Sequence, residues 1–187
     1  SPVFRRGSRA PRTVCASTRW VARAPVVASN SEGRPGVQPL ARADIAMAIA
    51  ASYRRRVGGE IASVGAEGSS SDIEQALMAS SSVILCHDGA ADPRFIFANN
   101  AAAVVWRMGI EDLVGMPSRL SAPPEMQAER AQALAQAATD GVLLGYSGER
   151  VAADGSRFMI IDATLWTVDL PEGGFGQAVR FDTWHAL

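Results

Sequence analysis

Three extended segments joined by short turns fill the C-terminal quarter of the chain and leave few folds open to it. They span about residues 142–152, 156–168 and 174–184. Asp154-Gly155 is a typical hairpin dipeptide, and residues 169–173 have the length of a second tight connection. Because such short connections join antiparallel neighbours, these residues predict an antiparallel meander that buries one face against helices, as in an α+β domain.

The two faces of the middle segment differ in character if its alternation is unbroken. One face is apolar throughout and is expected to pack on the helices: Met159, Ile161, Ala163 and Leu165. The opposite face is mixed and carries Phe158, Ile160 and Trp166. Such a face is too apolar to lie comfortably in water, so these three residues are the candidate interface with a second copy or a protein partner.

The upstream chain predicts further elements of both kinds. Strands are expected at residues 82–86 and 94–98, and helices at residues 44–57, 72–78, 101–108 and about 125–140, with one helical turn at 110–115. Asn99 is placed to cap the helix that follows it. In the Ala-rich helix, Met126, Leu134 and Ala137 point toward the core. The Gly/Ser-rich residues 65–71 favour a flexible link.

The N-terminal residues differ in charge from the rest of the chain. Residues 1–42 hold eight arginines and one acid, whereas residues 43–187 hold ten arginines and eighteen acids, giving net charges of +7 and −8. The basic, proline-containing leader is expected to be disordered and resembles a transit peptide, which indicates a chloroplast protein. The alternative is a solvated basic arm on a cytoplasmic protein. We therefore divide the chain into a leader (1–42), an amphipathic helix with its linker (43–71) and a folded domain (72–187).

Composition excludes several classes of function. An acidic domain argues against nucleic-acid binding, and the lack of lysine excludes Schiff-base chemistry. The sequence contains no uninterrupted apolar run of 18 residues, so it predicts no membrane span. Two cysteines and two histidines provide no disulfide framework and no zinc site. Cys86, His87 and Asp88 are consecutive on a strand and so point to alternating faces, which excludes a catalytic triad there. We expect no enzyme and no metal site.

Several short sequence segments resemble those of known families. Arg94 to Asn99, Leu113-Val114-Gly115 and Asp154 to Phe158 are similar to PAS domains. A second set of phrases resembles the MEKHLA domain, a PAS-related family, over about residues 44–187: His87-Asp88-Gly89, Pro117 to Ala122, Tyr146 to Arg150 and Gly176-Gln177-Ala178. The resemblance implies a PAS-like five-stranded antiparallel sheet with short helices on one face, preceded by the N-terminal helix and the disordered leader. It also implies a sensory or dimerisation module of unspecified ligand.

Candidate ligand residues follow from polar side chains in or near the expected core. They are Gln177, Asn99, Arg119, Arg150 and Tyr146. Gln177 shares its face with Phe175, Val179 and Phe181, so its amide bonds either backbone or a ligand. Arg119, Arg130, Arg150 and Arg157 hold either an anionic ligand or nearby carboxylates, and Asn99 serves either the ligand or its helix cap.

Two functions remain open at this stage. The first is a non-enzymatic regulatory module that forms a homodimer or binds a protein partner. The alternative is a small-molecule sensor with an apolar or flavin-like ligand under the sheet. Residues 99–141 contain neither the cysteine of a light-sensing flavin domain nor a haem-ligating histidine, so the cofactor stays unspecified. Neither function requires nucleic acid or a membrane.

Overall fold

The centre of the fold is one antiparallel sheet with the spatial strand order β2-β1-β5-β4-β3, to which β6 is added by pairing with β4. The computed structural model describes residues 40–62 and 68–187. The strands are β1 (Val83–Asp88), β2 (Phe95–Ala98), β3 (Val142–Val151), β4 (Arg157–Asp169), β5 (Phe175–Phe181) and β6 (Thr183–Ala186). The predicted α+β class and its antiparallel meander are confirmed.

The last predicted strand is two strands. Residues 164–169 of β4 pair with β5, and residues 158–161 of β4 pair with β6, so the chain breaks near Asp182 and continues along the same neighbour. On its other edge β5 pairs with β1. The sheet therefore has six strands where five were predicted.

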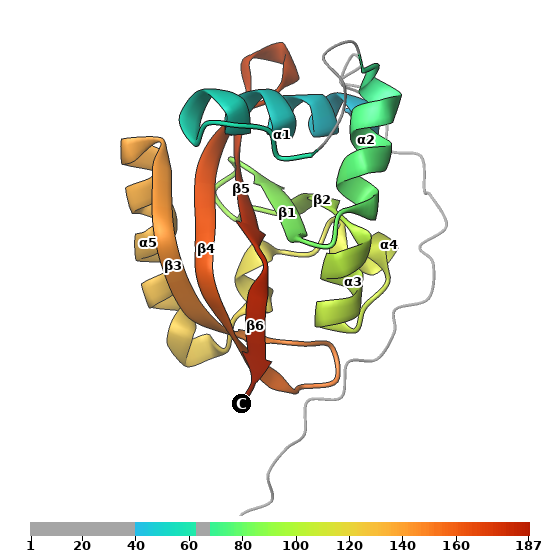
Figure 1. Cartoon of the computed structure of the whole chain (residues 1–187). Coiled ribbons are helices and arrows are strands. Elements are labelled where there is room, and N and C mark those ends of the chain that lie inside the picture. Colours follow the sequence, from blue (N-terminus) through green and yellow to red (C-terminus); the bar gives the residue numbers. More distant parts are fainter. Residues whose placement is uncertain (1–39, 63–67) are drawn as a thin grey trace, which may run out of the picture. The chain divides into compact units, whose positions relative to one another are not determined.

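Helices cover both faces of this sheet (Figure 1). They are α1 (Arg42–Arg56), α2 (Ser70–Ala79), α3 (Asn100–Trp106), α4 (Ile110–Leu113) and α5 (Gln127–Asp140), with short 3-10 turns at Ser118–Ser121 (η1), Pro124–Met126 (η2) and Pro171–Gly173 (η3). One apolar cluster joins α3, α4 and α5 to the sheet, and a second cluster joins α1 and α2 to the opposite face. The expectation of short helices on one face holds for α3 to α5, and α1 and α2 add the second layer.

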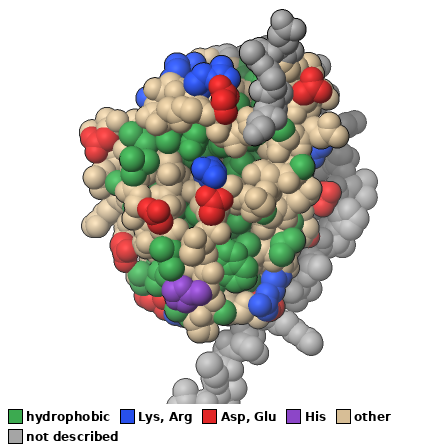
Figure 2. All heavy atoms as spheres, viewed as in Figure 1, with side chains coloured by type: hydrophobic (Ala, Val, Ile, Leu, Met, Phe, Trp, Pro, Cys, Tyr) green, Lys and Arg blue, Asp and Glu red, His purple; other side chains and the backbone are tan. Residues whose placement is uncertain are grey.

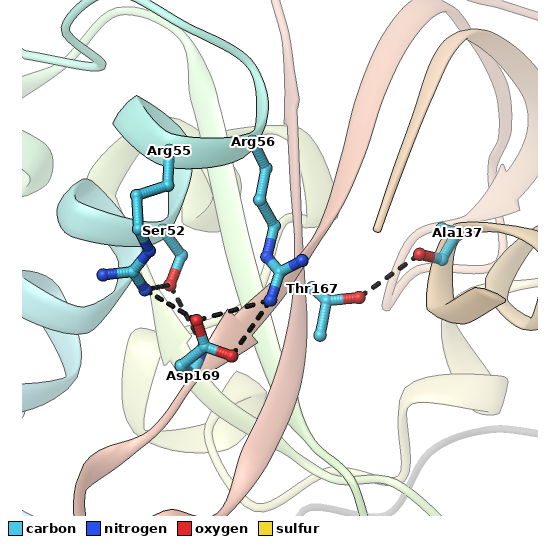
Figure 3. Close-up of polar contacts among 6 residues, drawn as sticks. All are labelled: Ser52, Arg55, Arg56, Ala137, Thr167 and Asp169. Carbon is cyan, nitrogen blue, oxygen red and sulfur yellow. Dashed lines mark hydrogen bonds and ion pairs between the residues drawn. The ribbon is translucent and has the colours of Figure 1, made fainter. Parts of the chain in front are cut away.

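Helix α1 lies against β4 and belongs to the folded unit. Its predicted apolar side chains Ile45, Ile49 and Tyr53 are buried, and the ring of Tyr53 meets Trp166 edge-on at 5.1 Å. Asp169 N–H donates to the Ser52 hydroxyl (3.1 Å), while Arg55 and Arg56 reach the Asp169 carboxylate (Figure 3). Exposed ion pairs contribute about 0–1 kcal/mol, so the apolar burial supplies most of the docking energy and the polar contacts set the position of α1.

A bulge in β4 overturns part of the predicted face assignment. Asp162 has a positive φ of 54° and the pairing of β3 with β4 shifts register beside it, which moves later residues to the opposite face. Phe158 and Ile160 therefore point inward together with Ala163 and Leu165. Met159 and Ile161, expected in the core, are only partly buried.

The predicted interface is wrong for two reasons: the bulge turns Phe158 and Ile160 inward, and α1 covers Trp166 on the opposite face. Phe158 is 3% exposed, Ile160 1% and Trp166 0%. The first two lie in the cluster beneath α3 and α5, and Trp166 lies beyond the bulge on the other face, under α1. None of the three is available to a partner.

The link predicted at residues 65–71 is shorter than expected. Ser69 and Asp72 form a capping box, in which Asp72 N–H donates to the Ser69 hydroxyl and Ser69 N–H donates to the Asp72 carboxylate. Ser70 and Ser71 are therefore helical. Residues 63–67 and the leader up to residue 39, including the proposed transit peptide, lie outside the described residues. Within the described part, no helix has the length and apolar character needed to cross a membrane.

Candidate functional site

A small void lies between the sheet and the layer of α3 and α5. Its volume is about 30 Å³, which is space for on the order of two water molecules. Its wall is mainly apolar and includes Leu85, Phe95, Trp106, Ile160, Leu165 and Phe181. Five polar residues also line it: His87, Ser121, Arg130, Arg150 and Gln177.

A larger groove opens beside this void, along α5. Its volume is about 510 Å³, and it lies between α5, the connection of β1 to β2 and η1, which is within the range of small-ligand pockets. Four alanines of α5 make much of its wall: Ala128, Ala131, Ala135 and Ala138. His87, Arg130, Leu134 and Gln177 line both spaces, so they form the boundary between the groove and the void.

Two buried arginines meet at the void without a carboxylate. Arg130 is 9% exposed, and in residues 40–62 and 68–187 no group hydrogen-bonds or ion-pairs with it. Burial and the neighbouring Arg150 lower the pKa of Arg130 to about 10. Arg150 is 6% exposed and donates to the Glu149 carbonyl oxygen (2.7 Å) and the Tyr146 hydroxyl (3.1 Å). The structure thus collects two cations in a place where burying charge is costly.

Tyr146 and Arg150 meet because both point to the same side of β3. Tyr146, Gly148 and Arg150 face the core side because they pair with Ala163, Ile160 and Phe158. The guanidinium carbon of Arg150 lies 5.4 Å from the centre of the Tyr146 ring. A side chain on Gly148 would place its Cβ only 2.5 Å from the Tyr146 hydroxyl, so the glycine makes the space in which Tyr146 and Arg150 meet.

His87 contributes a neutral imidazole. Its Nδ1 lies 2.7 Å from the Asp88 carbonyl oxygen, which only accepts, so Nδ1 carries the proton. Burial first, and Arg130 in addition, lower the pKa of His87 to about 4, against an opposing contribution from Asp88. Nε2 is buried without a partner in the described part of the chain. It is therefore an acceptor at neutral pH.

Two further polar groups near the site are buried and unpaired among the described residues. They are the Ser118 hydroxyl, in a residue of the groove wall, and the Trp106 indole N–H, in a residue of the void wall. Cys86 points to the other face, into the cluster under α1, where burial raises the pKa of its thiol. Cys86 and His87 are thus separated by the sheet, as the alternation predicts.

Gln177 and Thr167 fasten α5 to the sheet. The two residues are opposite each other on β5 and β4. The Gln177 side-chain amide donates to the Leu134 carbonyl oxygen (2.7 Å), and the Thr167 hydroxyl donates to the Ala137 carbonyl oxygen (3.2 Å). The backbone tie expected as one role of Gln177 is confirmed, and the same residue lines both spaces.

The remaining candidate residues either pair with acids or lie away from both spaces. Arg119 lines the groove but pairs with Asp92 (3.0 Å), and Arg157 pairs with Glu125 and Glu149. Asn99 lies away from both spaces. It caps α3 by accepting from Ala102 N–H, and its amide donates to the carbonyl oxygens of Leu77 in α2 and Ser82 before β1. Its cap role is therefore confirmed and its place in the ligand pocket is wrong.

Two residues of the site were not among the candidate pocket residues selected from the sequence. They are His87, and Arg130, which was named only as one of four arginines that hold either an anionic ligand or a carboxylate. Arg130 lies four residues after Met126 and four before Leu134, on the helix stripe predicted to face the core. A charge on that stripe was the available signal. No cluster of three or more His, Cys, Asp or Glu side chains suited to a metal ion occurs in the described ranges.

Comparison with solved structures identifies the fold. A PAS domain of a protein from Colwellia psychrerythraea superposes with a TM-score of 0.51 and 13% identity, over 58% of this chain and 92% of that one. An RNA-binding light-oxygen-voltage receptor superposes with a TM-score of 0.51 and 18% identity, over 64% of this chain and 35% of that one. A PAS domain from a two-component sensor histidine kinase gives a TM-score of 0.46 and 12% identity, over 59% and 88%.

Comparison of sequences identifies the family. No curated protein matches the chain. The family model of the MEKHLA domain matches residues 43–186, from the first turn of α1 to the end of β6. The chain therefore belongs to the MEKHLA domain family, and its described residues adopt the PAS-like fold of a sensory or regulatory domain.

Proposed function

We propose that this protein is a non-catalytic sensor that binds a small molecule in the void and groove beside α5. The observation that carries the proposal is the convergence of Arg130, Arg150 and His87, all buried, on one opening. A buried polar group without a partner costs about 1–3 kcal/mol, and more if it is charged. A ligand that pairs with these groups would offset this cost, which gives a physical reason for their presence.

The competing function is binding of a protein or a second copy. The residues that first supported it, Phe158, Ile160 and Trp166, are buried. Hydrophobic side chains do reach the surface on the face viewed in Figure 2. Near the C-terminus, Trp184 is 42% exposed and Leu187 62%. A homodimer or protein partner stays a prediction, and these residues are now its support.

A flavin does not fit the enclosed part of the site. The void of about 30 Å³ is an order of magnitude smaller than a pocket of about 300 Å³ for a drug-sized ligand, and Trp106, Ile160 and Phe95 wall it. The ligand we propose has its bulk in the groove and only a small group in the void.

The route from ligand to output runs through β4. Thr167 bonds α5, and Asp169, two residues further along the strand, binds Ser52, Arg55 and Arg56 of α1 (Figure 3). A ligand that moves α5 changes the strain on Thr167 and hence on the end of β4. We propose that α1 is the element that responds, because a shift of packed elements between two positions can transmit binding from one site to another.

Hydrogen exchange and mass spectrometry test this function together. The gently purified full chain should carry a small molecule in native mass spectra, and its removal should lower amide protection in both α5 and α1. The variant Asp169→Asn should keep the protection change in α5 and lose it in α1. A chain that carries no small molecule and is stabilised by none in a thermal-shift screen would refute the proposal.

A further inference from the structure

We infer that the ligand is a small organic carboxylate, with its charged group between Arg130 and Arg150 and its apolar body along the alanines of α5. This inference rests on the proposed ligand-binding function and assigns a chemical class to the ligand. It is built from three observations: the charge at the void, the state of the nearby acids, and the shapes of the two spaces.

The charge at the void is positive and unbalanced. Arginine keeps its proton at neutral pH, and its planar fork matches a carboxylate. Arg130 and Arg150 both line the void, and no described residue supplies a carboxylate to either of them. Like charges in a low-dielectric site repel strongly, so an anion between them would relieve the repulsion.

Three acids close to the site in the groove wall or in the chain, Asp92, Glu149 and Asp88, are already engaged. Asp92 pairs with Arg119, and Glu149 pairs with Arg157. The Asp88 carboxylate accepts from the Arg94 backbone N–H (3.0 Å). The described part of the protein thus holds its rim acids in other contacts and leaves the two inner arginines for a group from outside.

The shapes of the two spaces suit a head and a body. The void of about 30 Å³ holds a group of about two water molecules in size, as a carboxylate is. The Trp106 indole N–H, in a residue of the same wall, is another unpaired donor. The groove of about 510 Å³ offers Ala128, Ala131, Ala135 and Leu134 to an apolar body, and its own cation, Arg119, is neutralised by Asp92.

Matched acid and amide probes test the charge. Phenylacetate and phenylacetamide, and hexanoate and hexanamide, would be titrated into the ligand-freed full chain by calorimetry, with inorganic phosphate as a headgroup lacking an apolar body. We expect each carboxylate to bind about tenfold or more tightly than its amide, and phosphate to bind more weakly than both carboxylates.

Each other outcome overturns something specific. Amides that bind as tightly as the acids would refute the carboxylate inference and leave the proposed sensor intact. Phosphate that binds more tightly than the carboxylates would also refute it, since the apolar groove would then contribute nothing. If no probe binds, the carboxylate inference fails, and the co-purified species in native mass spectra then decides the sensor separately.

Variants of the two arginines separate a binding role from a structural one. Arg130→Met and Arg150→Met should each weaken carboxylate binding about tenfold or more. Arg130→Met should also raise the melting temperature of the ligand-free chain by about 2–4 °C, because it removes a buried charge that has no partner among the described residues. Arg150→Met also removes the hydrogen bonds to Tyr146 and the Glu149 carbonyl oxygen, so its melting temperature is not used to separate the two roles. If Arg130 has a structural role, its replacement would instead lower the melting temperature. Arg130→Lys keeps the charge but removes the planar guanidinium, so it tests whether that group's shape is needed for binding. It replaces the Met variant if the latter fails to fold.

Arg42→Met is the matched control for loss of an arginine. Arg42 pairs with Glu74 on the exposed side of α1 and lines neither space. The affinity of the Arg42→Met variant for the carboxylates should match that of the unaltered chain. If Arg130→Met and Arg150→Met also retain that affinity, the assignment of the ligand class is wrong.

Discussion

Acidification should destabilise this protein through His87. The pKa of this buried imidazole is lowered from 6.5 to about 4, so the unfolded chain binds the proton more readily than the folded one. The contribution of His87 to the free energy of unfolding therefore falls as pH drops through the window from about 6.5 to about 4, and this contribution is fully lost below it. At 1.36 kcal/mol per pKa unit, the contribution is on the order of 3 kcal/mol. Burial is the main cause of this lowered pKa; of the charged groups that face His87, Arg130 on α5 lowers it further and Asp88 on β1 opposes the shift.

The measurement is the free energy of unfolding in urea at several pH values between 7 and 4, for the unaltered chain and for His87→Gln. Glutamine does not titrate, so the difference in stability between the two proteins should change by about 3 kcal/mol across the window, while contributions of carboxylates cancel. His185→Gln, in the exposed strand β6, controls for loss of a histidine. If the difference stays constant with pH, His87 is not buried in its neutral form and the geometry of the site is wrong.

Three further predictions concern the packing around the site and the surface of the sheet. Gly148→Ala should cost about 1–3 kcal/mol and weaken carboxylate binding, because the new Cβ displaces Tyr146 from Arg150; an unchanged denaturation midpoint would contradict this. Trp166→Ala should cost about 3–5 kcal/mol and raise hydrogen exchange in α1, since Trp166 carries the Tyr53 contact; a loss below about 1 kcal/mol would show that α1 docks by other means. Light scattering of the full chain should give a dimer, and a monomer at high concentration would end the homodimer prediction.

Much of the fold could be predicted because local signals agree with it. Asn99 caps α3 as its sequence position indicates, and Asp154-Gly155 marks the turn between β3 and β4. The core residues of α1 follow the helical period at Ile45, Ile49 and Tyr53. These features depend on neighbours three or four residues away, so the sequence alone is sufficient for them.

The candidate site was less predictable because its members come from separate elements. Arg150 and Gln177 were identified as candidates, since polar residues on core-facing strands are conspicuous. Arg130 was equally conspicuous on the stripe of Met126 and Leu134, yet nothing in the sequence distinguished an unpaired arginine from one that meets an acid. Arg119 and Arg157 do meet acids. Which arginines find a carboxylate depends on distances in space.

The wrong face assigned to Phe158 and Ile160 of β4 has a single physical cause. Alternation assigns faces correctly only while the backbone is regular, and one residue in a left-handed conformation at Asp162 inverts the assignment. Aspartate tolerates that conformation better than most residues, but the sequence does not mark it, because many aspartates lie in regular strands. The bulge moved Phe158 and Ile160 from a supposed surface to the core.

By itself, the sequence determined the class of fold, the family and most element boundaries, because hydrophobic period, caps and turns act over a few residues. The tertiary structure alone decided which face each side chain of β4 serves, that α1 covers the sheet surface expected to bind a partner, and that two arginines share one void without an acid. Those outcomes depend on register and on contacts between residues far apart in the chain, and no local preference encodes them.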